Sequence, residues 1–200
     1  METKTDTLIE ALYDVPEDGK AEIVNGGLLV MEPTGGLPSR SSGDIYVHLR
    51  SYEKETSTGY AFPDNTGFIV NLPNRRSFSP DTSYFVGELQ GGKFLEGAPI
   101  FAVEVRSESD YGPVAEQKMA AKRADYFAAG TQVVWDVDVL RDQVITSTEQ
   151  MIRKIPPPTP KTKSPKQNQP SPAGQCPSTI AYHKSNFLNK KTQNLIFLRF

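Results

Sequence analysis

The stretch FAVEVRSESD, residues 101–110, decides the fold and raises the main question about this chain. Its first six residues alternate between two sets, which is the period-2 pattern of a β-strand. In that register Glu104 and Arg106 share one face of the strand. A carboxylate inside an apolar run needs a partner or a ligand, because burying an uncompensated charge is costly. Glu104 is therefore a candidate site residue, and a structural ion pair with Arg106 or Lys122 is the alternative.

A second carboxylate occupies a similar position upstream, in SFSPDTSYFV, residues 77–86. Asp81 follows a proline and opens a run rich in strand-forming residues, Tyr84–Val86. An aspartate after a proline is also a common turn residue, which is the structural alternative here. If both strands lie in one sheet, Asp81 and Glu104 could meet at one point of it.

The segment 113–129 is the strongest helix prediction, since it is rich in Ala and is followed by Gly130. Lys118, Lys122 and Tyr126 are spaced by four residues and so line one stripe of this helix. That stripe can face the sheet edge where the two carboxylates meet. Two carboxylates suit Mg²⁺, and a neighbouring lysine can stabilise a negatively charged transition state. The alternative is that the lysines are merely solvated.

The other predicted elements complete an α/β order with a mixed sheet flanked by helices. They are a helix at 4–14, a hairpin at 21–31, a helix at 44–56, strands at 66–72, 84–86 and 100–106, and a strand at 131–139. Asp136 and Asp138 lie two apart on the last strand, so they share a face and could reach solvent. No zinc site, His-based triad or phosphate-binding glycine loop is evident.

Composition divides the chain into two parts. Through Thr146 there are 13 Lys+Arg against 23 Asp+Glu, and from Ser147 onward there are 9 against 1. We expect one domain at 1–146 and a disordered Pro/Lys-rich tail at 147–200. One cysteine fits a reducing compartment. No signal peptide or membrane span is evident, so we expect a cytoplasmic protein that does not bind membranes.

Four stretches in series resemble the Uma-type restriction endonuclease family, a branch of the PD-(D/E)XK nuclease superfamily. They are AEIVNGGLLVMEPTGG, SPDTSYFV, FAVEVRSESD and KRADYFAAGTQVVWDVD, spread over about residues 7–145. The resemblance implies a restriction-endonuclease-like core of αβββαβ type. That element order agrees with the one predicted from the residues.

The resemblance also implies roles for particular residues. Asp81 matches the aspartate of the PD motif, and Glu104 matches the acidic residue of (D/E)XK. Arg106 stands where that motif has its lysine, and the family pattern of Lys, three residues, Tyr, three residues, Gly is met by Lys122, Tyr126 and Gly130. Lys118 is the fallback. Glu22 matches a further acidic position. Beside Glu104, the backbone carbonyl of Val105 could serve as a further ligand of the same ion.

The implied activity is that of an endonuclease that cuts DNA phosphodiester bonds with Mg²⁺ or Mn²⁺. The alternative is a nuclease fold that no longer cuts and serves as a binding or accessory module; a glycosidase is a weaker idea. The acidic balance of residues 1–146 opposes DNA binding, which normally uses Lys and Arg. A groove built from Arg40, Arg50, Arg75 and Arg76 could supply the phosphate contacts. A homodimer is one assembly that the sequence leaves open.

The tail raises a separate hypothesis, that it is an out-of-frame translation product. Back-translated and read one base upstream, the segment from Ser147 admits a string that begins VYRADDPENPTT and ends PGWTMPVDD, which resembles the family's ending. A single-base deletion near Val144–Thr146 would produce the switch. We then expect the strand at 131–139 to lose its outer neighbour, which would expose a sheet edge and destabilise the domain.

Overall fold

The computed structural model describes residues 4–15, 19–141, 143–148 and 179–181. Its helices are α1 (Lys4–Tyr13), α2 (Gly36–Thr56) and α3 (Pro113–Ala128). Its strands are β1 (Lys20–Val24), β2 (Gly27–Met31), β3 (Tyr60–Phe62), β4 (Phe68–Ile69), β5 (Ser77–Phe78), β6 (Thr82–Phe85), β7 (Leu95–Glu96), β8 (Phe101–Val105), β9 (Val133–Asp138), β10 (Gln143–Thr148) and β11 (Thr179–Ala181).

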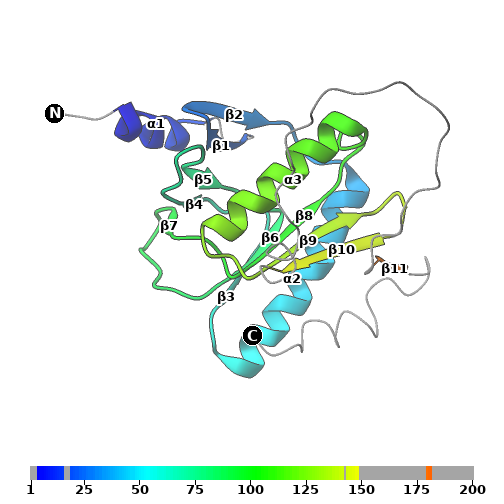
Figure 1. Ribbon diagram of the computed structural model, residues 1–200. Helices are drawn as coiled ribbons and strands as arrows, with labels where there is room; N and C mark the ends of the chain where they lie inside the picture. Colours follow the sequence, from blue (N-terminus) through cyan, green and yellow to red (C-terminus); the bar gives the residue numbers. More distant parts are fainter. Residues whose placement is uncertain (1–3, 16–18, 142, 149–178, 182–200) are drawn as a thin grey trace, which may run out of the picture.

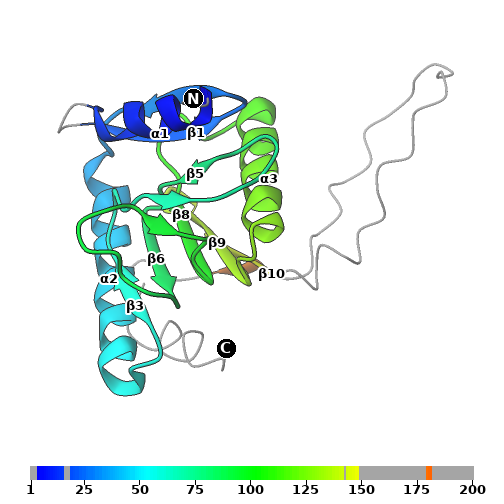
Figure 2. The same cartoon turned by 90° about the vertical axis from the view of Figure 1, so that its left-hand side faces the viewer.

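The centre of the fold is a six-stranded mixed sheet of order β11-β10-β9-β8-β6-β3. Only β8 and β9 run parallel within it, and the other pairs are antiparallel. Figure 2 shows α2 on one side of this sheet and α3 on the other, with α1 and the β1–β2 hairpin across the top. The predicted fold class, an α/β domain with a mixed sheet flanked by helices, is confirmed (Figure 1).

Different local features determine where the two helices that flank the sheet begin and end. In α3, Pro113 stands in the first turn and Gly130, with φ of 106°, follows the last. In α2, the helix begins at Gly36, eight residues before the predicted start at 44. Pro38 is tolerated because it lies in the first turn. Ser42, buried in that early part, donates a hydrogen bond to the Asp81 carbonyl at 2.7 Å. The helical spacing of the later apolar residues does not reveal this contact, so it predicts a start that is too late.

Two apolar clusters hold the layers together. Between α2 and the sheet lie nine buried residues: Ile45, Leu49, Ala61, Tyr84, Phe101, Val103, Val105, Trp135 and Val137. The other face of the sheet contributes to a second cluster with α3 and the small β5-β4-β7 sheet: Phe68, Val70, Phe78, Phe85, Leu95, Ala102, Tyr126 and Val134. The second face is apolar only at one end. Its other end carries the polar residues described below.

Two predictions about individual segments are wrong. The strand predicted at 66–72 is only Phe68–Ile69, and it belongs to the separate three-stranded sheet. Asp136 and Asp138 share a face, but they do not reach solvent: their exposed fractions are 0% and 2%. They are buried because α3 and the loop after β8 bring cations and a tyrosine onto them. A two-residue alternation indicates which residues share a face, and it does not say which element covers that face.

The outer edge of β9 is paired, contrary to the prediction. We expected it to lose its neighbour, whereas β10 pairs antiparallel along it, from Val133 opposite Thr148 to Asp138 opposite Gln143. β11 pairs in turn with β10. The rest of the predicted tail lies outside the described residues. Residues 147–148 of β10 and the three residues of β11 are strand residues within the predicted tail, which differs from the predicted disorder. For the remainder of the tail the disorder stays a prediction, as do the boundary at 146 and the frameshift.

Candidate active site

Asp81 lies at the start of β6, where main-chain contacts hold it on both sides. Its amide donates to the Val103 carbonyl at 3.0 Å, and the Val105 amide donates to its Oδ2 at 2.7 Å. Its carbonyl accepts the Ser42 hydroxyl. These contacts tie the carboxylate to the neighbouring strand β8, so its position is fixed by the sheet and not by a flexible loop.

Glu104 lies in β8, next to the strand that Asp81 precedes. The register of the antiparallel strands β6 and β8 ends at Thr82 opposite Val103, which are the chain neighbours of Asp81 and Glu104. The negative charge of Asp81 raises the pKa of Glu104, as expected for two carboxylates that lie close together. The two side chains are mostly covered, with exposed fractions of 12% for Asp81 and 11% for Glu104. The carboxylates thus form a close pair that solvent still reaches.

Helix α3 brings Lys122 and Tyr126 onto Glu104 from the same side. Lys122 Nζ lies 2.7 Å from Glu104 Oε2, and the Tyr126 hydroxyl donates to Oε1 at 2.6 Å. The Tyr126 ring stacks on Phe78, with centroids 4.0 Å apart. Lys122 Nζ also lies 2.9 Å from Glu22 Oε1. One turn of α3 therefore presents a charge and a hydroxyl to a single carboxylate.

Strand β1 supplies Glu22, which is buried with an exposed fraction of 1%. Besides Lys122, it accepts hydrogen bonds from the Ser79 amide at 2.9 Å and from the Arg75 guanidinium. Burial raises the pKa of Glu22, but Lys122 and Arg75 outweigh it and the net pKa lies below the ordinary value. Glu22 is thus an anion that holds Lys122 in place. The site joins four separate segments of the chain.

The electrostatics distinguish the members of this cluster. Burial raises the pKa of Glu104 to about 7, and the negative charges of Asp81 and Glu22 add to the rise against the opposing charge of Lys122. Burial lowers the pKa of Lys122, but Glu104 and Glu22 outweigh it, so the net pKa lies well above the ordinary lysine value. Lys122 is therefore a permanent cation near neutral pH. Burial and the charge of Glu104 raise the pKa of Tyr126 well above its usual value, so its hydroxyl stays a donor.

Lys20 belongs to the same site and sequence analysis did not single it out. Its Nζ lies 2.6 Å from Asp81 Oδ1 and 2.7 Å from Asp64 Oδ1. Burial lowers its pKa, but the charges of Asp81 and Glu104 outweigh this and the net pKa is raised. The only sequence signal is that Lys20 and Glu22 alternate in KAEIV, which puts both on one face of β1.

The structure does not bring the other predicted residues together in the same way. Lys118 is exposed on α3 and makes no contact with Asp81 or Glu104 in the described part of the chain. Val105 contributes its amide to Asp81; its carbonyl stays a predicted ligand. Arg75 is buried, bound to Glu22 and to Asp125, so it cannot line an open DNA groove with Arg40, Arg50 and Arg76.

Arg106, at the position of the usual motif lysine, binds other acidic residues and not the carboxylate pair. Its guanidinium donates to both oxygens of Asp136, at 2.6 and 2.7 Å, and to Glu116. Arg123 donates to the same Asp136 at 2.8 Å. Arg106 is 2% exposed, so this is an ion cluster under α3. The alternative that Arg106 pairs with Glu104 is not what the structure shows.

The candidate site offers a divalent cation two carboxylates. Among the described residues no group of three or more His, Cys, Asp or Glu side chains is arranged to hold a metal. Two neighbouring carboxylates remain, and Mg²⁺ is commonly bound through one or two carboxylates together with water. Each carboxylate oxygen that accepts one hydrogen bond retains a second lone pair. Asp81 and Glu104 therefore fit a hydrated Mg²⁺ or Mn²⁺ ion.

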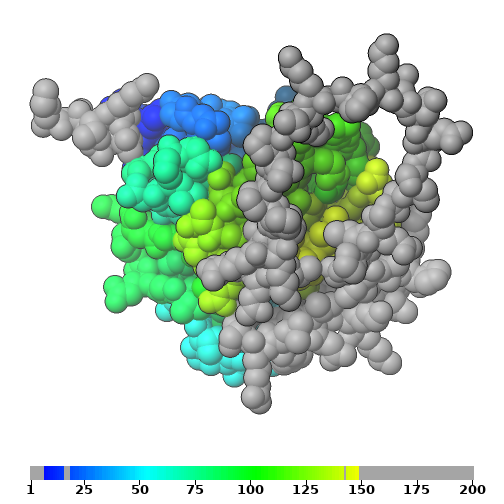
Figure 3. Space-filling model, in the orientation of Figure 1, coloured from blue at the N-terminus to red at the C-terminus, as the bar shows by residue number. Residues whose placement is uncertain are grey.

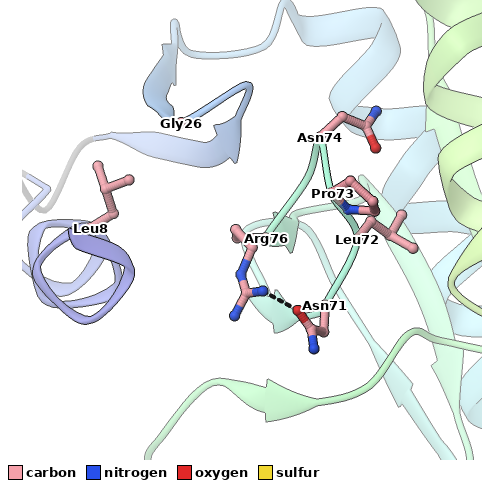
Figure 4. A pocket seen from close by; sticks show the side chains of 7 residues that line it. All are labelled: Leu8, Gly26, Asn71, Leu72, Pro73, Asn74 and Arg76. Atoms are coloured by element: carbon pink, nitrogen blue, oxygen red, sulfur yellow. Dashed lines mark hydrogen bonds between the residues drawn. The ribbon is translucent and has the colours of Figure 1, made fainter. Parts of the chain in front are cut away.

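A separate surface pocket of about 370 Å³ lies away from this pair. It is lined by Leu8, Gly26, the loop 71–74 and Arg76, and Figure 4 shows the Arg76 guanidinium turned toward Asn71. On the surface, the blue N-terminal segments adjoin the teal segment around β4 and β5 (Figure 3). The pocket contains none of the carboxylates discussed above.

In the described part of the chain, no helix combines the length and the hydropathy that a membrane span requires.

Comparisons with known proteins concern the fold and the family. Among solved structures, the chain is similar to one titled "putative nuclease belonging to DUF820 from Anabaena variabilis ATCC 29413". The TM-score is 0.53 at 20% identity, covering 71% of this chain and 79% of that chain. At this identity the likeness shows a shared fold. No curated protein matches the chain.

A family model gives the stronger result. The Uma2 model, described as "Putative restriction endonuclease", matches residues 7–165. The match includes Glu22, Asp81, Glu104, Lys122 and Tyr126, and it passes the predicted domain boundary at 146. Because it spans well over half of the chain, the resemblance found in the sequence is confirmed, and the protein belongs to the Uma2 family, described as "Putative restriction endonuclease".

Proposed function

We propose that this protein is a metal-dependent endonuclease that hydrolyses DNA phosphodiester bonds. Family membership supports a nuclease-like function. The observation that carries the proposal is the pair Asp81 and Glu104, the first tied to β8 through the Val105 amide and the second within β8, with Lys122 bonded to Glu104 at 2.7 Å. Carboxylates fixed to strands and a cation fixed to a helix are the parts that phosphodiester hydrolysis needs.

Asp81, Glu104 and the Val105 carbonyl would hold a Mg²⁺ or Mn²⁺ ion. Such an ion neutralises charge on a phosphoryl oxygen and makes bound water a stronger nucleophile. Lys122 serves as a fixed positive charge beside the phosphate, because its raised pKa keeps it protonated. It is therefore a charge stabiliser and not a general base.

Tyr126 and Glu22 are positioning residues in this scheme. The Tyr126 hydroxyl fixes one oxygen of Glu104, and stacking on Phe78 fixes the ring that carries it. Glu22 holds Lys122 through a second ion pair, at 2.9 Å. Neither needs to touch the substrate. Both keep the rotamers of the groups that do.

DNA as the substrate must be reconciled with the acidic balance of residues 1–146. Arg75 is engaged internally, so Arg40, Arg50 and Arg76 are the remaining members of the predicted groove. A few localised cations give a shallow salt dependence of binding, because each phosphate contact releases about one counterion. The cytoplasm as location and a homodimer as assembly are expectations from the sequence.

The alternative, a nuclease fold that no longer cuts, has one specific observation in its favour. All four oxygens of the pair already accept a hydrogen bond: from Lys20, the Val105 amide, Lys122 and Tyr126. An ion would have to share or displace these donors. A protein that keeps the arrangement without metal would bind nucleic acid and leave it intact.

Nicking of supercoiled plasmid tests the proposal. The wild-type protein is incubated with Mg²⁺ or Mn²⁺ and compared with Glu104→Gln, which removes the charge and keeps the shape. Glu88→Gln, a change at an exposed glutamate, is the matched control. We expect Glu104→Gln to lower nicking by about 100-fold or more, on the scale of losing one preorganised catalytic group, and Glu88→Gln to leave it unchanged. Wild-type protein that nicks with neither metal would support the alternative.

A further inference from the structure

Lys20 is a buried cation that the proposed function does not use. Its side chain is 13% exposed, and its Nζ is shared between Asp81 Oδ1 and Asp64 Oδ1 at 2.6 and 2.7 Å. Asp64 lies in the loop after β3, and its side chain is 39% exposed. The ammonium therefore bridges a carboxylate of the candidate metal pair and a third carboxylate nearer to solvent.

The position of Lys20 is set by its strand. β1 pairs with β2 throughout, with Lys20 opposite Met31, and its far end bridges to Arg75. Lys20 and Glu22 point to one face, so the same strand supplies a cation to Asp81 and an anion to Lys122. A surface lysine would be free to swing away. This one extends from a strand that is fixed at both ends.

The contacts of Lys20 are those that a second metal ion would make. Two-metal phosphodiesterases hold their ions about 3.5–4 Å apart, and a shared carboxylate commonly bridges them. Here Asp81 would be that shared carboxylate and Asp64 the outer ligand. Mg²⁺ holds oxygens at about 2.0–2.1 Å. The aspartate oxygens lie 2.6 and 2.7 Å from the Lys20 Nζ, so each would need to move inward by roughly half an ångström to bind an ion in its place.

We propose that the Lys20 ammonium takes the place of a second divalent cation, so that the site operates with a single ion bound to Asp81 and Glu104. The inference rests on the proposed function, because it presupposes that first ion. One positive charge at this position is weaker than two, and it needs no metal from solution. Removing it leaves Asp81 and Asp64 facing each other without compensation, which creates a binding site for a second ion.

Titration of the full chain with Mn²⁺ by calorimetry tests this without reference to cleavage. We expect one Mn²⁺ per wild-type chain and two per chain for Lys20→Ala. Lys20→Arg, which keeps the charge, should retain one. Lys93→Ala, which removes an exposed lysine, is the matched control and should also bind one. Adding Asp64→Asn to Lys20→Ala should return the count to one.

Nicking gives a second readout. In Lys20→Ala the rate should depend on Mn²⁺ with a Hill coefficient near two, against one for the wild type, and high Mn²⁺ should restore part of the lost rate. Lys20→Met covers the case in which the alanine variant does not fold, because it preserves the apolar stem. Two ions in the wild type would overturn the inference and leave the proposed function standing. One ion in both Lys20→Ala and Lys20→Met would do the same. No Mn²⁺ bound to the wild type would overturn both.

Discussion

Tyr126→Phe isolates one hydrogen bond of the candidate site. The hydroxyl donates to Glu104 Oε1 at 2.6 Å, and the ring, fully buried, stacks on Phe78 at a 13° angle. Phenylalanine keeps the ring, the stacking and the buried apolar area. The substitution therefore removes a single donor from a carboxylate that burial already disfavours.

The size of the effect follows from the charge state of Glu104. A hydrogen bond to a charged group contributes about 1.5–3 kcal/mol, and one between neutral groups about 0.5–1.5 kcal/mol. The pKa of Glu104 is raised to about 7 by burial. The loss of unfolding free energy should therefore be at the lower range at pH 6 and at the higher range at pH 8.5. A cost of about 1.4 kcal/mol on the reacting geometry corresponds to a tenfold lower rate.

Urea unfolding at the two pH values and plasmid nicking at limiting Mn²⁺ measure the two consequences. Tyr111→Phe is the matched control: its hydroxyl also donates to a carboxylate at 2.6 Å, that of Asp138, outside the site. Both variants should lose stability, and only Tyr126→Phe should lose about tenfold in nicking. Equal nicking by the two variants would refute the assigned role of Tyr126. A stability loss that does not grow with pH would refute the reasoning about Glu104.

Four further predictions concern the site, the neighbouring ion cluster and the gene. Lys122→Met should abolish nicking, since it removes the fixed cation, whereas Lys118→Met should not change it. Asp136→Ala should cost about 3–5 kcal/mol in urea unfolding, because it removes the buried anion shared by Arg106 and Arg123 and leaves Arg106 with the half-exposed Glu116. A loss under 1 kcal/mol would contradict the ion cluster. Nicking should fall below pH 7 as Glu104 takes up a proton. Folding without metal should respond in the opposite direction, because a raised pKa in the folded state favours the protonated form. The stabilisation from protonated Glu104 is present below the unfolded pKa and is lost as pH rises toward 7. Resequencing of the gene tests the frameshift, which codons incompatible with the shifted reading for residues 147–180 would exclude.

Local patterns were sufficient to find part of the site. Alternation in FAVEVR indicates that Glu104 lies within a strand. The proline before Asp81 indicates where the upstream strand begins. Spacing by four residues placed Lys122 and Tyr126 on one stripe of a helix. In each case the informative residues are close in sequence, and one repeating geometry converts their spacing into a direction.

Contacts between distant segments could not be predicted in this way. Lys20 reaches Asp81 across 61 positions, and nothing in the local period of KAEIV says which carboxylate it meets. The start of α2 was missed because Ser42 is fixed by the Asp81 carbonyl and not by helical spacing. Asp136 was expected at the surface because alternation does not identify what packs above a face. Arg75 was expected in a groove for the same reason.

The position of the lysine in this site follows from what occupies the face of β8. Glu104 and Arg106 lie two apart on that face, so a lysine in place of Arg106 would point toward the same layer as the carboxylates. Asp136 lies opposite Glu104 in the parallel register with β9 and is fully buried, which requires a cation that can bind both its oxygens. Arginine satisfies that geometry in a planar, bidentate way and lysine does not. Once Arg106 is committed to Asp136, the cation for Glu104 has to come from the layer above, and Lys122 on α3 is the residue that reaches it. Arg106→Lys should therefore not create a second active lysine; it should loosen the Asp136 cluster and lower the unfolding free energy, with nicking that still depends on Lys122.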